Sequence, residues 1–331
     1  MYIEDLKFSL WADFIERDYL DGGFKELIAQ KIINGATSNP AIFKNAILNS
    51  PAYKAQLDAL DANLEAKQKY EALAIYDIQK AADILKPLYD AGDDGYVSIE
   101  VDPFLCDDAK ATIEEGKRLF RDIGRENVMI KIPATKAGYE AMEELTACGI
   151  PVNATLIFKK EQALQCAKAF ERGAKKHGSA VDTVISVFVS RVDRALDKRL
   201  SEAGVSRALS GIYNAADIYN GVEALHVEKC RTLFASTGVK DDSLPAHYYI
   251  EQLLAYNSVN TAPIETIEAY IVNGAKAKAL PVSDTVIQEH FKQVEQAGID
   301  LEAELQKQID DGLQAFKDAF SEILEALWKQ K

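Results

Sequence analysis

The chain has 331 residues, of which 48% are hydrophobic and 27% are charged, and these proportions are typical of a folded globular protein. Its formal net charge of −14 disfavours non-specific binding to nucleic acid or to an anionic membrane surface, so an anionic substrate would need a local cationic pocket. No apolar run approaches the roughly 20 residues that span a bilayer, and the first residues lack the basic and apolar regions of a signal peptide.

Eight short apolar or alternating runs, separated by amphipathic stretches, predict strands that alternate with helices. The runs are 7–13, 33–39, 96–102, 128–134, 152–158, 181–188, 231–236 and 256–262. Alternation of this kind indicates a parallel sheet with crossover helices, and eight repeats predict a closed (β/α)8 TIM barrel of the α/β class. A doubly wound open sheet is the alternative, but the absence of a GxGxxG pattern disfavours dinucleotide binding.

Three amphipathic stretches, 108–124, 139–149 and 160–178, end on a glycine, which is a typical helix stop. Two segments exceed a plain barrel. Residues 41–95, between the second and third strands, contain at least two helical patterns, and residues 282–331 form a charged, amphipathic helical tail. The length would allow two domains, but no low-complexity linker divides the chain, so residues 1–331 are interpreted as one barrel domain.

The cysteines and histidines do not suggest a metal site or a disulfide framework. None of the four cysteines forms a CxxC pair or stands at zinc-ligand spacing from a histidine, and the four histidines are scattered along the chain. Reduced, mostly buried thiols favour a cytoplasmic location.

Strand side chains alternate between two faces, so residues of equal parity point the same way. In 128–134, Val128, Ile130 and Ile132 share an apolar face, whereas Lys131 lies on the other. The same division in the other runs places polar groups near the carboxyl ends of the strands, where barrels have their active sites. The residues expected to meet at this mouth are Asp13, Thr37, Asn39, Ser98, Glu100, Lys131, Asn153, Thr155, Ser186 and Ser236.

The alternation also makes two detailed predictions about apolar side chains. It groups Leu156 with Val152 and Ala154 on the face that meets the helices, and it groups Phe234 with Ser236 on the face that points into the barrel.

A lysine at the mouth of a barrel has a specific chemical use. Burial favours the neutral amine, which attacks a carbonyl to form a Schiff base, and the protonated imine permits cleavage of a neighbouring C–C bond. Asp13 and Glu100 would supply the proton transfers that this chemistry needs. As structural alternatives, the amine of Lys131 reaches water or forms a simple ion pair with Glu100, and Asp13 caps a helix.

Seven segments resemble the strand motifs of the transaldolase family, and in particular of a longer bacterial and plant subgroup. They follow the order of the strands from about residue 8 to 267. The segments are GATSNPAIF (35–43), SIEVDP (98–103), VMIKIPAT (128–135), VNATLIF (152–158), SVFVSRVD (186–193), ASTGVKD (235–241) and SVNTAPIETI (258–267).

This resemblance implies a step of the pentose phosphate pathway without a metal or organic cofactor. A dihydroxyacetone unit would pass from sedoheptulose 7-phosphate to glyceraldehyde 3-phosphate, giving erythrose 4-phosphate and fructose 6-phosphate. Lys131 would form the Schiff base, Asp13 would act as general acid and base in C–C cleavage, and Glu100 would act through a water with Thr155. Substrate contacts would come from Thr37, Asn39, Ser98, Asn153, Ser186 and Phe188.

The resemblance also implies that Arg191 and Ser236 hold the substrate phosphate. The best-known pattern has a second arginine shortly after this serine, whereas the present chain has Lys240 nearby, which would substitute as a point charge. In the alternative interpretation, Arg191 pairs with a neighbouring acid, Asp193 or Asp197.

Two other functions fit parts of the pattern. A fructose-6-phosphate aldolase would release free dihydroxyacetone, but such relatives are shorter and typically have glutamine and tyrosine at the positions of Glu100 and Phe188. A barrel that binds sugar phosphates without turnover would use Lys131 and Glu100 only as a structural pair.

Overall fold

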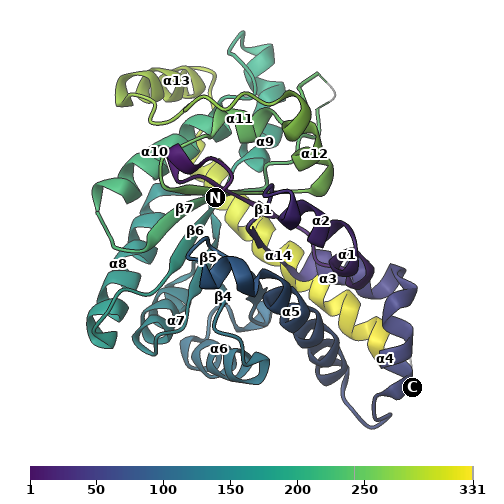
Figure 1. Cartoon of the computed structure of the whole chain (residues 1–331). Helices are drawn as coiled ribbons and strands as arrows, with labels where there is room; N and C mark the ends of the chain where they lie inside the picture. The colour runs from purple at the N-terminus through teal and green to yellow at the C-terminus, as the bar shows by residue number, and fades with distance from the viewer. Residues whose placement is uncertain (242, 330–331) are drawn as a thin grey trace.

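Eight parallel strands close into a barrel in sequence order in the computed structural model, which describes residues 1–241 and 243–329 (Figure 1). This confirms the predicted TIM barrel, and each strand overlaps the run that predicted it. The strands are β1 (Ser9–Ala12), β2 (Gly35–Ala36), β3 (Tyr96–Glu100), β4 (Val128–Pro133), β5 (Val152–Ile157), β6 (Thr183–Phe188), β7 (Cys230–Ala235) and β8 (Ser258–Ala262).

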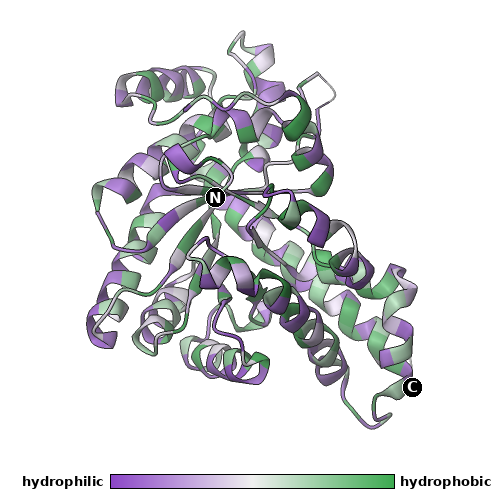
Figure 2. Ribbon diagram, in the orientation of Figure 1, coloured by the Kyte–Doolittle hydropathy of each residue, from purple (hydrophilic) through white to green (hydrophobic). Residues whose placement is uncertain are grey.

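Helices surround the barrel and turn their hydrophilic faces outward (Figure 2). The predicted stops at Gly124, Gly149 and Gly178 have φ values of 64°, 76° and 89°, a left-handed conformation that glycine adopts without steric cost. The barrel helices are α1 (Arg17–Asp21), α2 (Gly23–Ala29), α6 (Ala109–Ile123), α7 (Lys136–Ala147), α8 (Lys160–His177), α9 (Ser190–Glu202), α10 (Ser210–Ala224), α11 (Tyr248–Gln252) and α12 (Ile264–Asn273). Short 3-10 turns occur at Glu4–Leu6, Pro51–Tyr53 and Pro103–Leu105.

The two predicted additions to the barrel are confirmed. Helices α3 (Pro40–Asn49), α4 (Lys54–Ala59) and α5 (Ala66–Asp90) lie between β2 and β3, and α13 (Asp284–Gln296) and α14 (Leu301–Trp328) form the tail. Residues 330 and 331 of the predicted tail lie outside the described residues. In Figure 1, α14, in yellow, crosses the end of the barrel and runs beside α3 and α5. Within the described residues, no helix combines the length and apolarity needed to cross a membrane.

The alternation of faces holds for most strands. Phe8, Leu10 and Ile130 pack in the outer core with the helices, whereas Trp11 and Met129 pack inside the barrel. The apolar side chains on the two faces of a strand thus belong to two separate clusters. The polar side chains of the inner face lie near the carboxyl ends of the strands.

Both detailed predictions about apolar side chains are wrong. Leu156 belongs to the inner cluster because its φ of 57° and a register shift between β5 and β6 interrupt the alternation, and Ile157 takes the outer position instead. In β7, Phe234 packs outward while Leu233 points inward. Ser236 nevertheless reaches the mouth, since it follows the strand with a φ of 55°.

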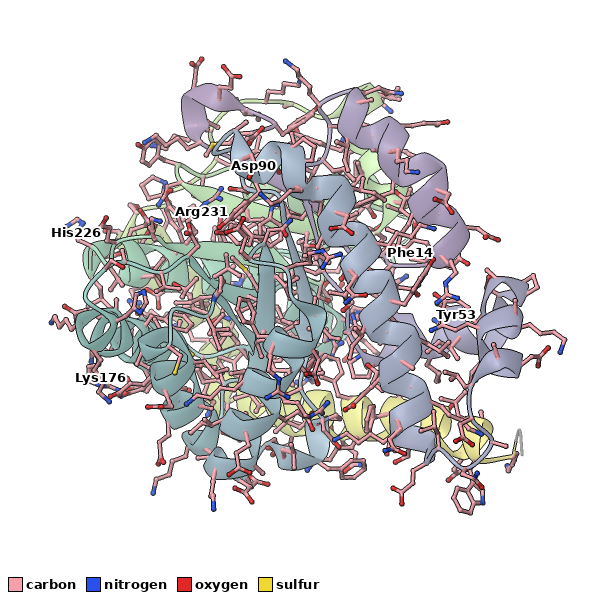
Figure 3. All side chains as sticks on the ribbon, turned by 60° about the horizontal axis from the view of Figure 1, so that its bottom comes forward. Phe14, Tyr53, Asp90, Lys176, His226 and Arg231 are labelled. Atoms are coloured by element: carbon pink, nitrogen blue, oxygen red, sulfur yellow. The ribbon has the colours of Figure 1, made fainter. Side chains whose placement is uncertain are left out.

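The opposite end of the barrel is closed by polar contacts. Arg231 forms an ion pair with Asp94 at 2.6 Å and donates hydrogen bonds to Ser9 Oγ and to the carbonyl oxygen of Ser258. Figure 3 shows Arg231 at one end of the strands and α14 at the other end. Access to the inner side chains is therefore from the carboxyl end, beneath α14.

Candidate active site

Lys131 lies on β4 with its amine inside the carboxyl end of the barrel, and only 4% of the residue is exposed. Its Nζ donates a hydrogen bond to the carbonyl oxygen of Ser38 at 3.0 Å and lies 3.7 Å from Glu100 Oε2. The ring of Phe316, from α14, lies with its centroid 6.0 Å from Nζ. The amine therefore does not reach bulk water, which excludes the solvent-exposed alternative.

Glu100 stands beside Lys131 because β3 and β4 pair these two residues in register. Burial raises the pKa of Glu100 to about 7, although the neighbouring Lys131 opposes the rise. Neither carboxylate oxygen has a hydrogen-bond partner among the described residues, and the buried hydroxyl of Thr155 also has none. A carboxyl group that titrates near neutrality and has free oxygens suits proton transfer better than a purely structural ion pair.

Asp13 follows β1 on another side of the same mouth and is half-buried. Thr37 donates a hydrogen bond from Oγ1 to Asp13 Oδ1 at 2.7 Å, and the Thr37 hydroxyl also lies 2.7 Å from Thr261 Oγ1. Burial raises the pKa of Asp13, and Lys131, the Thr37 hydrogen bond and Arg191 oppose this rise in that order. The carboxylate is thus held by Thr37, the residue after β2, and faces the cavity rather than capping a helix.

Lys131 and Asp13 border a small cavity of about 140 Å³ beneath α14, whereas Glu100 and Thr155 do not line it. Six predicted residues besides Lys131 and Asp13 line it, and four further lining residues were not predicted. The lining is Asp13, Thr37, Asn39, Ala41, Lys131, Ser186, Phe188, Arg191, Ala235, Ser236, Thr261 and Phe316.

Of the unpredicted lining residues, Thr261 contacts the Thr37 hydroxyl that holds Asp13, and Phe316 lies over the Lys131 amine. The alternation in the run 256–262 offered a signal for Thr261, which shares a face with the inward-pointing Val259. Phe316 had no such signal, because it belongs to the tail and reaches the cavity only through the packing of α14.

Three predicted contact residues form a hydrogen-bonded chain across the barrel floor. Asn153 donates from Nδ2 to Ser98 Oγ at 3.0 Å, and Ser186 donates from Oγ to Asn153 Oδ1 at 2.6 Å. Only Ser186 of the three borders the cavity. The structure thus places Asn153 next to Lys131, with which it pairs in register, while its amide is engaged with the two serines.

Arg191 lies in the first turn of α9, where the helix dipole favours an anion. Its guanidinium stacks 4.9 Å from the Phe188 ring centroid, and burial lowers its pKa, with a further contribution from Arg194. No carboxylate among the described residues forms an ion pair with it. Ser236 is close by, since its Oγ lies 3.2 Å from Ser190 Oγ.

The pairing of Arg191 with a neighbouring acid is therefore wrong. Asp193 accepts hydrogen bonds from the Gly211 N–H at 2.8 Å and the Tyr249 hydroxyl at 2.9 Å, and Asp197 accepts one from the Ala208 N–H. Lys240 is exposed and does not line the cavity, so its role in phosphate binding stays a prediction.

Asn39 both caps a helix and lines the cavity. Its side-chain oxygen caps the N-terminus of α3 by accepting a hydrogen bond from the Ile42 N–H at 3.0 Å, and the residue also lines the cavity. The cap fixes the side chain at the start of the inserted helices, so the insertion between β2 and β3 is tied directly to the site.

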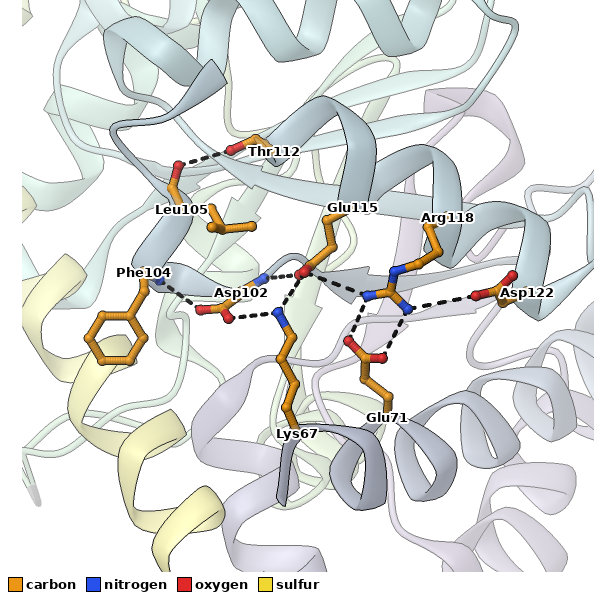
Figure 4. Close-up of polar contacts among 9 residues, drawn as sticks. All are labelled: Lys67, Glu71, Asp102, Phe104, Leu105, Thr112, Glu115, Arg118 and Asp122. Carbon is orange, nitrogen blue, oxygen red and sulfur yellow. Dashed lines mark hydrogen bonds and ion pairs between the residues drawn. The ribbon is translucent and has the colours of Figure 1, made fainter. Parts of the chain in front are cut away.

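A second anchor fixes the chain just after Glu100 (Figure 4). Lys67 of α5 contacts Asp102 at 2.7 Å and Glu115 of α6 at 2.6 Å, and Glu115 also accepts a hydrogen bond from the Asp102 N–H at 2.7 Å. Arg118 continues this network through a bidentate pair with Glu71. The end of β3, which carries Glu100, is thereby held between α5 and α6.

Across residues 1–241 and 243–329, no three or more His, Cys, Asp or Glu side chains group in a way that could hold an ion. The charged groups that do face the cavity are one lysine, one aspartate and one arginine.

Comparisons with known proteins agree with this arrangement. Residues 10–327 match the family model described as Transaldolase/Fructose-6-phosphate aldolase. A protein named Transaldolase from Campylobacter jejuni subsp. doylei is 47% identical over 97% of this chain and 99% of its own length. Another of that name, from Helicobacter pylori strain ATCC 700392 / 26695, is 44% identical over 96% and 98%. The chain therefore belongs to the transaldolase/fructose-6-phosphate aldolase family, and within it to the transaldolases.

Proposed function

We propose that this chain transfers a dihydroxyacetone unit from sedoheptulose 7-phosphate to glyceraldehyde 3-phosphate, giving erythrose 4-phosphate and fructose 6-phosphate, through a Schiff base on Lys131. The observation that carries the proposal is the buried Lys131 amine, 3.7 Å from Glu100 and at the wall of a cavity that also contains Asp13 and Arg191. A nucleophile (Lys131), groups for proton transfer (Glu100 and Asp13) and a cation for the phosphate (Arg191) are thus close together.

In the first step, the neutral Lys131 amine attacks the ketose carbonyl, and loss of water from the carbinolamine gives the protonated imine. Glu100 carries the protons of this dehydration through a water shared with Thr155. Its pKa of about 7 supports this role, because a group that titrates near the working pH gives and accepts protons with similar ease.

In the second step, Asp13 takes the proton of the hydroxyl on C4, the aldose-side carbon of the C3–C4 bond that is broken. The C–C bond then cleaves, the aldose phosphate leaves, and the bonding electrons move into the imine to give an enamine on Lys131. The acceptor aldehyde enters, and the same events run in reverse with Asp13 returning the proton. The Thr37 hydrogen bond supports this assignment by aiming the Asp13 carboxylate.

The phosphate group would bind at the start of α9. Arg191 offers a fork of donors without a competing carboxylate among the described residues, and Ser236 and the helix N-terminus add neutral donors. In a chain of net charge −14, such a local cation is the feature that an anionic substrate needs. Lys240 would add a second, more distant charge.

The hydroxyl groups of the bound three-carbon unit would contact Asn39, Thr37 and Ser186, which line the cavity. Asn153 and Ser98 would support Ser186 from below through their hydrogen bonds. Phe188 would place Arg191 by stacking.

We also propose a cytoplasmic location. All four cysteines, Cys106, Cys148, Cys166 and Cys230, are free thiols, a state that a reducing compartment maintains.

The direct experiment is covalent trapping. The enzyme is incubated with fructose 6-phosphate and borohydride, and the adduct is located by peptide mass spectrometry, with Lys131→Met as the matched control. We expect a three-carbon adduct on Lys131 and none in the variant. An adduct on another lysine, or no adduct despite sugar-phosphate binding, would contradict the proposal.

A further inference from the structure

Helix α14 presents one apolar face to the barrel mouth, and Phe316 is the residue of that face that reaches the reactive lysine. The buried positions of the helix recur every three or four residues, as one face of a helix requires. Phe316 is 3% exposed, lines the cavity with Lys131 and Asp13, and has its ring centroid 6.0 Å from Lys131 Nζ.

Gly312, one turn before Phe316, permits this close approach. A Cβ atom at residue 312 would lie 2.9 Å from Leu156 Cδ2 and 3.5 Å from Arg191 Nη1, so the glycine lets α14 pack directly over these two side chains. The glycine thus brings α14 down onto the phosphate-binding arginine, and the next turn carries the ring to the lysine.

The helix is held on both sides of the mouth. Near its start, Glu302 pairs with Lys159 of the segment after β5, and Glu304 pairs with Arg199 of α9 at 2.6 Å. Near its end, Glu322 pairs with Lys44 of α3 at 3.0 Å. The ring is therefore carried by an element fixed at both ends.

The enamine on Lys131 has two fates once the first aldose has left. It adds to the acceptor aldehyde, which completes the transfer. Alternatively, its carbon takes a proton, water adds to the resulting imine carbon and the C–N bond breaks, which releases free dihydroxyacetone and the Lys131 amine. Transfer consumes the acceptor aldehyde, whereas release consumes one water molecule and one proton from solvent, so access of water to the cavity favours release.

We infer that Phe316 determines specificity for transfer over hydrolysis, by occupying the space through which water would reach the three-carbon intermediate. The inference rests on the proposed Schiff base. The face of the ring also favours a neighbouring cation, so it stabilises the protonated imine while excluding water. Glu100 does not line this cavity, so the water that releases the finished ketose can act from a different side of Lys131.

The test compares Phe316→Ala and Phe316→Leu with Ile323→Ala, a fully buried position two turns further along the same helix that does not line the cavity. Fructose 6-phosphate is supplied alone or with erythrose 4-phosphate, and free dihydroxyacetone and transfer product are both quantified. For Phe316→Ala we expect the ratio of release to transfer to rise at least about tenfold, which corresponds to about 1.4 kcal/mol between the two barriers.

Ile323→Ala should leave that ratio unchanged even though it creates a comparable cavity. If both rates fall in proportion in the Phe316 variants, the residue is only structural and the inference is wrong. Phe316→Leu preserves most of the packing, so it gives the same readout if the alanine variant folds poorly. Borohydride trapping on Lys131 is done in parallel, because a missing adduct in the unmodified enzyme would overturn the Schiff-base proposal instead.

Discussion

Among the proposed catalytic residues, Glu100 has a pKa that burial raises to about 7. Its carboxyl group is enclosed on β3 beside Lys131, and neither oxygen has a protein hydrogen-bond partner in the described part of the chain. Burial removes hydration from the charged form, which Lys131 only partly compensates, so the pKa rises to about 7. The same perturbation has consequences for activity and for stability.

For activity, we expect the pH profile of kcat/KM to contain a limb near pH 7 that Glu100→Gln abolishes. The glutamine keeps the shape but cannot carry a proton, so imine formation should slow by about 10²–10⁴-fold. Stopped-flow measurement of imine formation across pH checks this. A variant that retained the limb would assign it to another group.

For stability, Glu100 ionises at about 4.5 in the unfolded chain and at about 7 in the folded one. Between these values the unfolded state releases its proton first, so this group's contribution to the free energy of unfolding falls as the pH rises. Glu100→Gln should therefore become more stable relative to the unmodified enzyme between pH 5 and pH 8. Urea unfolding at both pH values measures the difference, and a difference that does not change with pH would contradict the pKa.

Substitution of Asp13 should separate imine formation from C–C cleavage. In Asp13→Asn the Thr37 hydrogen bond can persist, but the general base is lost, so we expect C–C cleavage to slow by about 10²–10⁴-fold. The imine with the intact ketose should still form. Borohydride trapping would then give an adduct with the full carbon chain on Lys131, and full turnover in the variant would remove Asp13 from the mechanism.

At the scale of elements, Asp193 joins three helices behind the proposed phosphate site. It belongs to α9, accepts a hydrogen bond from the Gly211 N–H in the first turn of α10, and accepts another from Tyr249 of α11. α10 has no capping side chain of its own, so Asp193 caps it from the neighbouring helix. The same turn of α9 presents Arg191 to the cavity.

Asp193→Ala should lower the free energy of unfolding by about 1–3 kcal/mol, because buried donors of α10 and α11 lose their acceptor. Burial raises the pKa of Asp193 to about 7 from 3.8, so the loss should be largest at acid pH and shrink as the pH rises through this range. Chemical denaturation at pH 5 and pH 8 checks the trend. Asp58→Ala, which removes an exposed pair with Lys54, is the control and should change stability by less than about 1 kcal/mol.

At the scale of the whole molecule, the two ends of the barrel differ in how they are filled. Arg231 and Asp94 fill the amino end with paired charges, whereas the carboxyl end keeps an unfilled space with Lys131, Asp13 and Arg191 around it. At that second end, α14 of the tail packs against the inserted helices α3 and α5. The additions to the plain barrel thus contribute buried residues to the outer core, and α14 also borders the cavity through Phe316.

Much of this arrangement followed from the order of residues along the chain. Strand and helix periods are local properties, so the eight repeats, the glycine stops and the placement of Lys131 and Glu100 on inner faces could be read without a structure. The motifs around Lys131 and Asn39 also indicated the protein family. The interpretation of residues 1–331 as one domain remains a prediction.

Other features depended on contacts between distant segments. The inward turn of Leu156 arises from a backbone irregularity between paired strands, which a strict alternation does not contain. Arg191 does not form an ion pair with Asp193, because this carboxylate accepts its hydrogen bonds from α10 and α11. The pKa of Glu100 depends on how completely its neighbours exclude water, and the place of Phe316 depends on where α14 lies. Periodicity determines which way a side chain points along its own element, but burial, charge pairing and access to the reacting lysine are properties of the packed assembly, and only the tertiary structure decided them.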